Sequence, residues 1–382
     1  MTNRFPGKLA LQQRVLPNYR APFFDLLASY CDGGMSLFTG EPRPNEGITT
    51  TNQVQMIAKH PTLGTNYKVG KNIHLLGGKF YLCYQRGLID WLEEWNPDAL
   101  IVEANPRYLS TPSAVKWMHA RNKPVIGWGL GAPPLNPPHF QGKWGGIKGG
   151  VGFRERRRIN FLRQFDALIA YSQRGADEYA DLGFPLDNIF VAHNSVSPAP
   201  TWAMPNRPDA FRDQPCVLFV GRLQLRKNVD LLLGACAEIQ NVRLVIVGDG
   251  PEREAFEELA AEIYPSAEFV GAKHGEELKA YFEEADLFVL PGTGGLAVQE
   301  AMSYGLPVIV AEGDGTQDDL VRKENGWQVP PDDLDALVAT MKDALSDSAR
   351  LRKMGEESFR IVKEEINIGK MVEVFVTALR SV

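Results

Sequence analysis

The sequence has few cysteines and no apolar run long enough to cross a membrane. Its 4 cysteines, Cys31, Cys83, Cys216 and Cys236, are scattered through 382 residues and form no CxxC pair. This spacing argues against a disulfide framework or a zinc site and is typical of reduced thiols in a cytoplasmic protein. No window reaches ~18 uninterrupted apolar residues, and the N-terminus lacks the apolar core of a signal peptide. We therefore expect a cytoplasmic protein.

An excess of positive charge is also missing. The formal net charge of −6 at pH 7 argues against a general nucleic-acid-binding protein. The glycine-rich run at 131–153 contains no GK[ST] and is therefore not a P-loop. No DxD motif follows an expected strand, because Asp318 and Asp319 are adjacent and follow a loop. The sequence thus predicts neither a metal site of that type nor a bound cofactor.

Short apolar runs alternate with helical patterns along the chain. The expected strands lie at 9–16, 35–38, 73–76, 99–103, 125–128, 167–171, 217–220, 243–247, 268–270, 286–290 and 308–311, with an edge strand at 327–329. Helical patterns separate most of them, including 84–95 and 155–165, while 40–72 is interpreted as a long loop that could include a strand or two. This alternation predicts an α/β protein with parallel sheets covered on both faces.

A change of composition divides the alternation into two parts. Five prolines lie between Pro198 and Pro215. We expect an N-terminal domain at 1–200, a linker at 201–215 and a second domain at 216–365. Two doubly wound units joined in this way enclose a cleft, and ligands of such sheets bind outside the carboxyl ends of the strands.

The segment from Pro291 to Met302 predicts a phosphate site. It follows a buried strand, contains the glycines of Gly292-Thr-Gly-Gly295, and opens a helix at Leu296. Glycines let a ligand approach the backbone, and the helix start offers free N–H groups and a positive dipole end to a phosphate. Glu300 follows about 1.4 turns into the helix, within reach of hydroxyl groups on the same ligand.

A second segment, Gly221-Arg-Leu-Gln-Leu-Arg-Lys227, also follows a strand and opens a helix. With Val247-Gly-Asp-Gly-Pro251, Asp286-Leu-Phe-Val-Leu-Pro291 and Glu300-Ala-Met-Ser-Tyr-Gly-Leu-Pro307, it forms an ordered set across about 215–330. This set resembles the nucleotide-sugar half of a GT-B glycosyltransferase, most similar to family 4, whose members are retaining and independent of metal. The N-terminal half is similar more loosely, through Val15–Phe24 and Asp166–Ser172.

The resemblance implies a GT-B fold, with two Rossmann-like doubly wound domains facing across a cleft, and a role for each matching residue. Arg222 and Lys227 would hold the donor diphosphate, and Glu300 would bind the donor ribose. The final helix, 366–382, would pack back on the first domain, although packing on the second is the simpler alternative. The other implied donor contacts are Gly221, Val270, Gly271, His274, Gly294, Gly295 and Leu296, and the implied acceptor or phosphate contacts are Tyr19, Arg20, Trp128 and Gly129.

Two positions depart from the family pattern. Gly292 stands where the family often has a glutamate aimed at the donor sugar, and the run Gly127-Trp-Gly-Leu-Gly131 lacks the family's usual histidine. The resemblance therefore does not predict which sugar is carried. A retaining mechanism needs no dedicated protein base, because the departing phosphate oxygen can take the acceptor proton.

The functional prediction is a retaining, metal-independent glycosyltransferase, specifically a hexosyltransferase. It would use a nucleotide sugar of the UDP or GDP type and a glycan or lipid-linked acceptor, with no nucleic acid involved. The alternatives are a non-catalytic nucleotide-sugar-binding protein, with Gly292 as the sign of lost activity, and a sugar-nucleotide epimerase.

Each site residue also has an ordinary structural explanation. Arg222 and Lys227 could be solvated charges at a helix start, Glu300 could pair on the surface, and Tyr19 and Arg20 could simply pack. His193 and His274 could be hydrogen-bonded structural residues.

One basic cluster stands apart from the donor motifs. It consists of the segment Arg154–Arg158 together with Lys143, Lys148 and Arg163, close to Trp144 and Phe153. It is either a solvated helix face or a contact for anionic lipid at the inner face of the membrane.

Overall fold

The computed structural model describes residues 4–43, 46, 67–75, 81–132, 153–239, 241–294, 296–313 and 315–382. The chain forms two compact units, each with its own sheet. Unit 1 comprises Met1–Val196 and Ile368–Val382, and unit 2 comprises Ser197–Asn367. Within the described residues, no helix combines the length and the apolar character that a membrane span requires.

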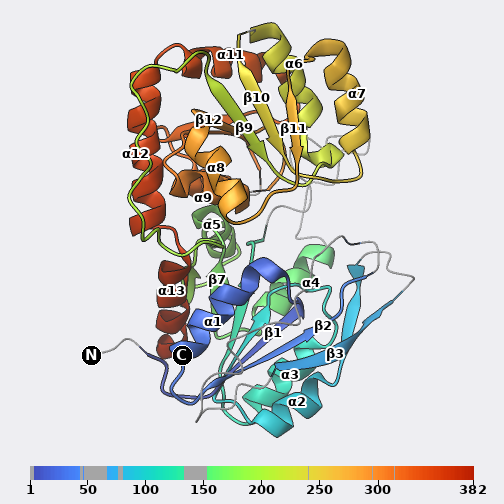
Figure 1. Cartoon of the computed structure of the whole chain (residues 1–382). Coiled ribbons are helices and arrows are strands. Elements are labelled where there is room, and N and C mark those ends of the chain that lie inside the picture. The colour runs from blue at the N-terminus through green and yellow to red at the C-terminus, as the bar shows by residue number, and fades with distance from the viewer. Residues whose placement is uncertain are drawn as a thin grey trace. The chain divides into compact units, whose positions relative to one another are not determined.

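Unit 1 is built on an eight-stranded sheet with the order β4-β3-β2-β1-β5-β6-β7-β8. Figure 1 labels β1, β2, β3 and β7 of this sheet. Neighbouring strands are parallel except β3 and β4, which pair antiparallel. The strands are β1 Leu9–Val15, β2 Met35–Gly40, β3 Tyr67–His74, β4 Cys83–Arg86, β5 Ala99–Glu103, β6 Val125–Gly129, β7 Ala167–Ala170 and β8 Ile189–Val191. The helices are α1 Ala21–Ser29, α2 Leu88–Trp95, α3 Thr111–His119, α4 Phe153–Leu162, α5 Gln173–Asp181 and α13 Ile368–Ser381, with 3-10 turns η1 Asn18–Arg20 and η4 Leu186–Asn188.

Both faces of this sheet are buried, because successive strand residues point to opposite sides. Leu9 and Leu11 of β1 join one core with α1 and α13, whereas Ala10 joins the other core with α2, α3 and α5. Such double burial explains why the strands read as continuous apolar runs.

The final helix, α13, packs on unit 1 beside α1 (Figure 1). Phe375 lies with its ring centroid 4.9 Å from that of Phe23 and 5.0 Å from that of Trp128. The C-terminal segment is thus part of the first unit's core although it follows the second unit in sequence.

Unit 2 is built on a six-stranded parallel sheet with the order β11-β10-β9-β12-β13-β14. The strands are β9 Cys216–Val220, β10 Arg243–Val247, β11 Glu268–Gly271, β12 Leu287–Leu290, β13 Val308–Ala311 and β14 Gly326–Val329. The helices are α6 Val229–Ile239, α7 Arg253–Ile263, α8 Glu276–Glu284, α9 Leu296–Ser303, α10 Thr316–Leu320, α11 Leu334–Leu345 and α12 Ser348–Glu364, with the 3-10 turn η5 Leu225–Lys227.

Three local predictions in unit 1 are wrong. The helix expected from residue 84 is preceded by β4, and Gly87, at φ 90°, separates the strand from α2. The strand expected at 73–76 is β3, which begins earlier, at Tyr67, within the range where the loop could include a strand, and β8 was not expected. Both β4 and β8 are short, with four and three residues, so their periodicity is hard to distinguish from that of adjacent helices.

The segment 201–215, expected to be a linker, lies against unit 2. The Trp202 ring stacks on Tyr304 with centroids 5.4 Å apart, and its Nε1 donates to the Ser303 carbonyl. Arg207 donates to the carbonyl oxygens of Phe282 and Ala285. The chain passes between units at 196/197 and 367/368 instead.

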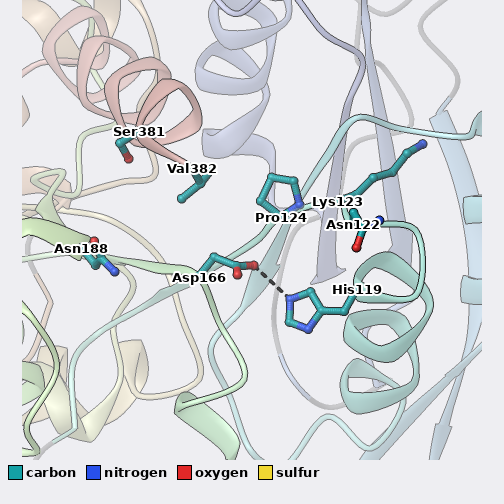
Figure 2. Close-up of a pocket in the computed structure, with 8 residues that line it drawn as sticks. All are labelled: His119, Asn122, Lys123, Pro124, Asp166, Asn188, Ser381 and Val382. Atoms are coloured by element: carbon teal, nitrogen blue, oxygen red, sulfur yellow. Dashed lines mark hydrogen bonds and ion pairs between the residues drawn. The ribbon is translucent and has the colours of Figure 1, made fainter.

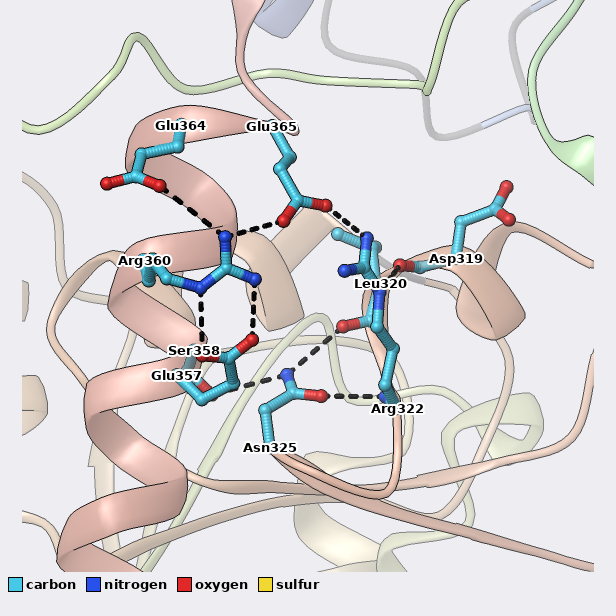
Figure 3. A network of polar contacts seen from close by, with 9 residues as sticks. All are labelled: Asp319, Leu320, Arg322, Asn325, Glu357, Ser358, Arg360, Glu364 and Glu365. Atoms are coloured by element: carbon cyan, nitrogen blue, oxygen red, sulfur yellow. Dashed lines mark hydrogen bonds and ion pairs between the residues drawn. The ribbon is translucent and has the colours of Figure 1, made fainter.

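A polar network holds the C-terminal end of α12 inside unit 2 (Figure 3). Arg360 forms ion pairs with Glu357 and Glu365 at 2.6 and 2.7 Å, and Arg322 pairs with Glu365 at 2.7 Å. The Asn325 side chain accepts from the Arg322 backbone N–H at 2.6 Å. The network therefore fixes the last residues of unit 2 shortly before the chain returns to unit 1.

Candidate functional site

The donor-site residues expected from the motifs follow two adjacent strands of unit 2. β9 and β12 pair in parallel, so the segments after Val220 and after Leu290 leave the same edge of the sheet. The first segment carries Gly221, Arg222 and the turn η5, and the second leads to the start of α9. These are the carboxyl ends of the strands, where ligands of parallel sheets bind.

Lys227 is the residue that joins these two segments. Its Nζ donates to the Thr293 carbonyl at 2.5 Å. A Cβ placed on Gly294, which has φ 115°, would lie 2.6 Å from the same Nζ. Burial, with a smaller contribution from the charge of Arg226, lowers the pKa of Lys227 to about 8. A partly desolvated ammonium group beside a glycine turn is suited to bind a phosphate.

Gly292 has a structural role that explains the missing glutamate. A Cβ at this position would lie 2.4 Å from both the carbonyl oxygen of Arg226 and the Cα of Lys227. The Thr293 N–H donates to that carbonyl at 3.0 Å, and Asn228 donates to the Pro291 carbonyl at 3.3 Å. Backbone contact between η5 and the β12–α9 loop thus occupies the space that a side chain at 292 would need.

Glu300 lies in α9 and is partly buried. Burial raises the pKa of its carboxyl group, while the charge of His274 acts in the opposite direction. His274 is exposed in the loop between β11 and α8. The structure thus brings Glu300 and His274 close enough to interact electrostatically.

The remaining donor-site glycines differ in what they contact. Gly271 ends β11 at φ 75°, and its carbonyl accepts from the Gly248 N–H at 2.9 Å. A Cβ on Gly248 would lie 1.8 Å from the Gly221 carbonyl oxygen, and one on Gly250 would lie 2.2 Å from the Leu223 carbonyl oxygen. The Gly-Asp-Gly motif therefore packs one loop against another.

The other expected donor residues lie at the same edge. Arg222 is exposed, Val270 is partly buried in β11, and Leu296 begins α9. Gly295 lies outside the described residues, as do Lys143, Lys148 and Trp144 of the basic cluster. Sequence reasoning missed Thr293 and Arg226, although both are direct neighbours of residues that it singled out.

In unit 1 the structure brings Tyr19, Arg20 and Trp128 together. The Arg20 guanidinium carbon lies 4.9 Å from the centroid of the Trp128 ring and 5.5 Å from that of Tyr19. Trp128 is only 1% exposed and packs in the core. The Arg20 guanidinium therefore lies against a ring that is itself held in place. Gly129 ends β6, and a Cβ there would lie 2.9 Å from the Tyr179 hydroxyl.

Glu103 is a polar residue of this edge that the motifs did not indicate. It ends β5, and its carboxylate accepts a hydrogen bond from the Arg14 N–H. Burial raises its pKa to about 7, although this backbone hydrogen bond and the charges of Arg14 and Arg20 lower it. An acidic residue that ends an expected strand is the signal that could have identified it.

A cavity of about 510 Å³ lies elsewhere in unit 1 (Figure 2). Its lining includes Pro124, Asp166 and Asn188, which precede β6, β7 and β8. It is thus at the amino edge of the sheet. His119, half-exposed, contacts Asp166 at 3.0 Å there, and Asp166 also accepts from the Val125 N–H. These contacts fix the start of two strands, which is a structural role.

Residues 201–360 match the family model described as "Glycosyl transferases group 1". A relative from Rhizobium meliloti (strain 1021), the lipopolysaccharide core biosynthesis glycosyltransferase LpsE, is 26% identical over 288 residues, covering 70% of this chain and 82% of LpsE. A GDP-mannose-dependent alpha-mannosyltransferase of Mycobacterium tuberculosis (strain CDC 1551 / Oshkosh) is 41% identical over 120 residues, covering 31% of this chain and 30% of that protein. The chain spans no more than half the length of several other curated relatives that it matches.

Among solved structures, Anabaena Alr3699/HepE in complex with UDP superposes with a TM-score of 0.70 at 16% identity, covering 98% of this chain and 100% of that one. A putative UDP-N-acetylglucosamine 2-epimerase from Listeria monocytogenes superposes with a TM-score of 0.60 at 15% identity, covering 98% of this chain and 96% of that one. This chain thus has the GT-B fold. The resemblance drawn from the motifs is therefore confirmed by the family model and by the fold.

Proposed function

We propose, starting from the match of 201–360 to the group 1 glycosyltransferases and from the GT-B fold, that this protein transfers a sugar from a nucleotide donor to an acceptor hydroxyl. The observation that carries the proposal is Lys227, a partly buried cation held against the glycine turn at the start of α9. A partly buried cation beside a helix N-terminus is an arrangement that stabilises a diphosphate.

In the proposed reaction, residues of unit 2 stabilise the negative charge of the departing diphosphate. The bond between the sugar anomeric carbon and the diphosphate breaks, and a bond from the acceptor oxygen to that carbon forms. The acceptor proton passes to the departing phosphate oxygen. Arg222, Lys227 and the α9 N-terminus would stabilise the diphosphate in place of a metal, and Glu300 would bind ribose hydroxyls. Entry of the acceptor on the leaving-group face gives retention.

The donor class is proposed from the relatives. HepE binds UDP, and the mycobacterial relative depends on GDP-mannose. We propose a UDP- or GDP-linked hexose as donor, and a glycan or lipid-linked sugar as acceptor, in line with the lipopolysaccharide core role in the name of LpsE.

A thermal-shift panel of UDP-, GDP- and ADP-sugars tests the donor proposal. A true donor at 100 times its dissociation constant adds about 2.7 kcal/mol to the free energy of unfolding. We expect a rise in melting temperature for one nucleotide class and slow release of free sugar without acceptor. If no nucleotide raises the melting temperature, the proposal fails, and tight binding without any turnover would favour a binding protein.

We also propose peripheral contact with an anionic membrane surface at the cytoplasmic face. Arg156 and Arg157 are exposed on α4. Each such residue near an anionic surface is worth ~1 kcal/mol. We expect co-sedimentation with phosphatidylglycerol-containing vesicles that declines in an R156S/R157S variant. Equal sedimentation with neutral phosphatidylcholine vesicles would contradict the proposal.

A further inference from the structure

One buried side chain of α9 contacts both segments that connect unit 2 to unit 1. Gln299 is 1% exposed. Its Oε1 accepts from the Ser197 N–H at 3.4 Å, and its Nε2 donates to the Ile366 carbonyl at 2.7 Å. Ser197 is the first residue of unit 2, and the chain returns to unit 1 at Ile368, shortly after Ile366. A side-chain amide can accept and donate at once, so this single group holds both segments.

The entering segment, residues 197–207, contacts α9 again near the end of the helix. The Trp202 ring stacks on that of Tyr304 with centroids 5.4 Å apart, and its Nε1 donates to the Ser303 carbonyl at 3.2 Å. Arg207 donates to the Tyr304 carbonyl at 2.9 Å. Together with the amide contact described above, these interactions fix the entering segment to α9 from the middle of the helix to its C-terminal end.

The leaving segment, residues 348–367, lies against the same helix. A Cβ on Gly355 of α12 would lie 2.2 Å from the Gly305 carbonyl oxygen, so the backbone of α12 touches the turn that follows α9. At the end of this segment, the Asn367 side chain is 4% exposed and donates to the Val362 carbonyl at 3.0 Å. α9 is therefore in direct contact with both connecting segments.

The same helix begins at the proposed nucleotide contact. α9 starts at Leu296, directly after the glycine turn that Lys227 contacts. Glu300, which is proposed to bind the donor ribose, is the next residue after Gln299. Successive helix residues point about 100° apart, so one turn of α9 can present Glu300 to a ligand and Gln299 to the protein. Contacts thus run without a break from the nucleotide site to both connecting segments.

We infer that Gln299 is a positioning residue that couples occupation of the nucleotide site to the order of both connecting segments. The inference rests on the proposed function, because the bound nucleotide is what restrains α9. A ligand that restrains a helix also restrains the groups hydrogen-bonded to it, and contiguous packed and hydrogen-bonded groups carry such coupling between sites. The protein with bound donor then holds its two connecting segments more firmly than the free protein does.

The Ser197 amide reports on this coupling directly. Its hydrogen exchanges with solvent when the hydrogen bond to Gln299 opens, and hydrogen exchange measures the free energy of such local openings. At a saturating concentration of UDP or GDP, as selected by the thermal-shift panel, we expect exchange at Ser197 and at 366–367 to slow by about tenfold, a moderate coupling between sites. Calorimetry with the same nucleotide shows that the site is filled.

Gln299→Met tests the role of the amide, because methionine has nearly the same length and no amide group. The nucleotide should still bind, whereas the slowing of exchange at both segments should disappear. A purely structural role would speed exchange in the free and the bound protein alike and leave the ratio of the two rates unchanged. Gln299→Asn, a second variant, keeps the amide but is one methylene shorter. It cannot reach both partners and should lose the slowing at one segment at least.

Gln328→Met is the matched control, since the Gln328 amide of β14 also donates to a backbone carbonyl of unit 2, that of Val321 at 2.9 Å. It should keep the wild-type slowing. Slowing in Gln299→Met that equals the wild-type effect overturns the inference, as does loss of nucleotide binding in a folded Gln299→Met. A wild-type chain that binds nucleotide with no slowing at either segment also overturns it. A wild-type chain that binds no nucleotide contradicts the proposed function, and with it the premise of this inference.

Discussion

Replacing Lys227 with methionine is expected to weaken nucleotide binding by about 10- to 100-fold. Lys227 is the cation that lies against both the Thr293 carbonyl and Gly294, at the start of α9. A hydrogen bond to a charged group contributes roughly 1.5–3 kcal/mol, and each 1.4 kcal/mol is about a tenfold change in affinity. Isothermal titration of the variant with UDP and GDP measures the loss. The double variant Arg222→Ala with Lys227→Ala should lose both binding and turnover.

The pH dependence of binding separates this role from a structural one. The pKa of Lys227 is lowered to about 8, so the free protein carries a charged ammonium below that value and loses it above. A bound diphosphate favours the charged form, and nucleotide affinity should therefore decline as the pH rises above 8. The Lys227→Met variant should not show this decline.

Stability provides the control for the same variant. Burial disfavours the charged form of Lys227, so below pH 8 its removal should not lower the melting temperature. Lys279→Met, which removes a partly buried lysine of α8 paired with Glu276, should leave nucleotide affinity unchanged. Full activity in the Arg222→Ala, Lys227→Ala double variant would falsify the donor-site assignment.

Much of the fold could be predicted because the sheet of unit 2 is parallel, that of unit 1 is parallel apart from the β3–β4 pair, and helices cover both faces of each. Their strands are continuous apolar runs separated by helices, and this is the strongest signal that a single sequence carries. The edge strand β4 was not predicted. Its alternation, with Cys83 and Gln85 buried and Tyr84 and Arg86 exposed, extends over only four residues and is followed directly by a helix. β4 is held in the sheet by hydrogen bonds to β3, and this pairing is a contact between separate segments that no local pattern reveals.

The contacts of the donor-site glycines could not be predicted from the sequence. Sequence alone suggests that each glycine leaves room for a ligand. In the structure, Gly248, Gly250 and Gly292 leave room for the backbone of an adjacent loop, and Gly294 leaves room for the Lys227 ammonium group. These contacts join residues far apart in the chain, so no local pattern could distinguish them.

Replacing Gly292 with alanine is expected to lower both stability and nucleotide affinity. The new Cβ would lie 2.4 Å from the Arg226 carbonyl oxygen and from the Lys227 Cα, so the turn η5 would have to move. Overpacking of this kind costs typically 1–3 kcal/mol. The same movement displaces Lys227 from Thr293, and nucleotide affinity should fall with it. Urea denaturation and isothermal titration measure the two effects.

Gly234→Ala is the matched control, because a Cβ at this α6 position would meet Leu334 at an ordinary 3.5 Å. It should raise stability by about 0.5–1 kcal/mol, as for glycine to alanine in a helix. Gly292→Glu, which restores the family's residue, should be more harmful than Gly292→Ala, since its longer side chain must pass the same backbone. Tighter donor binding in Gly292→Glu would mean that η5 can move at little cost. The contact between η5 and the β12–α9 loop would then not explain why this chain has glycine instead of glutamate at position 292.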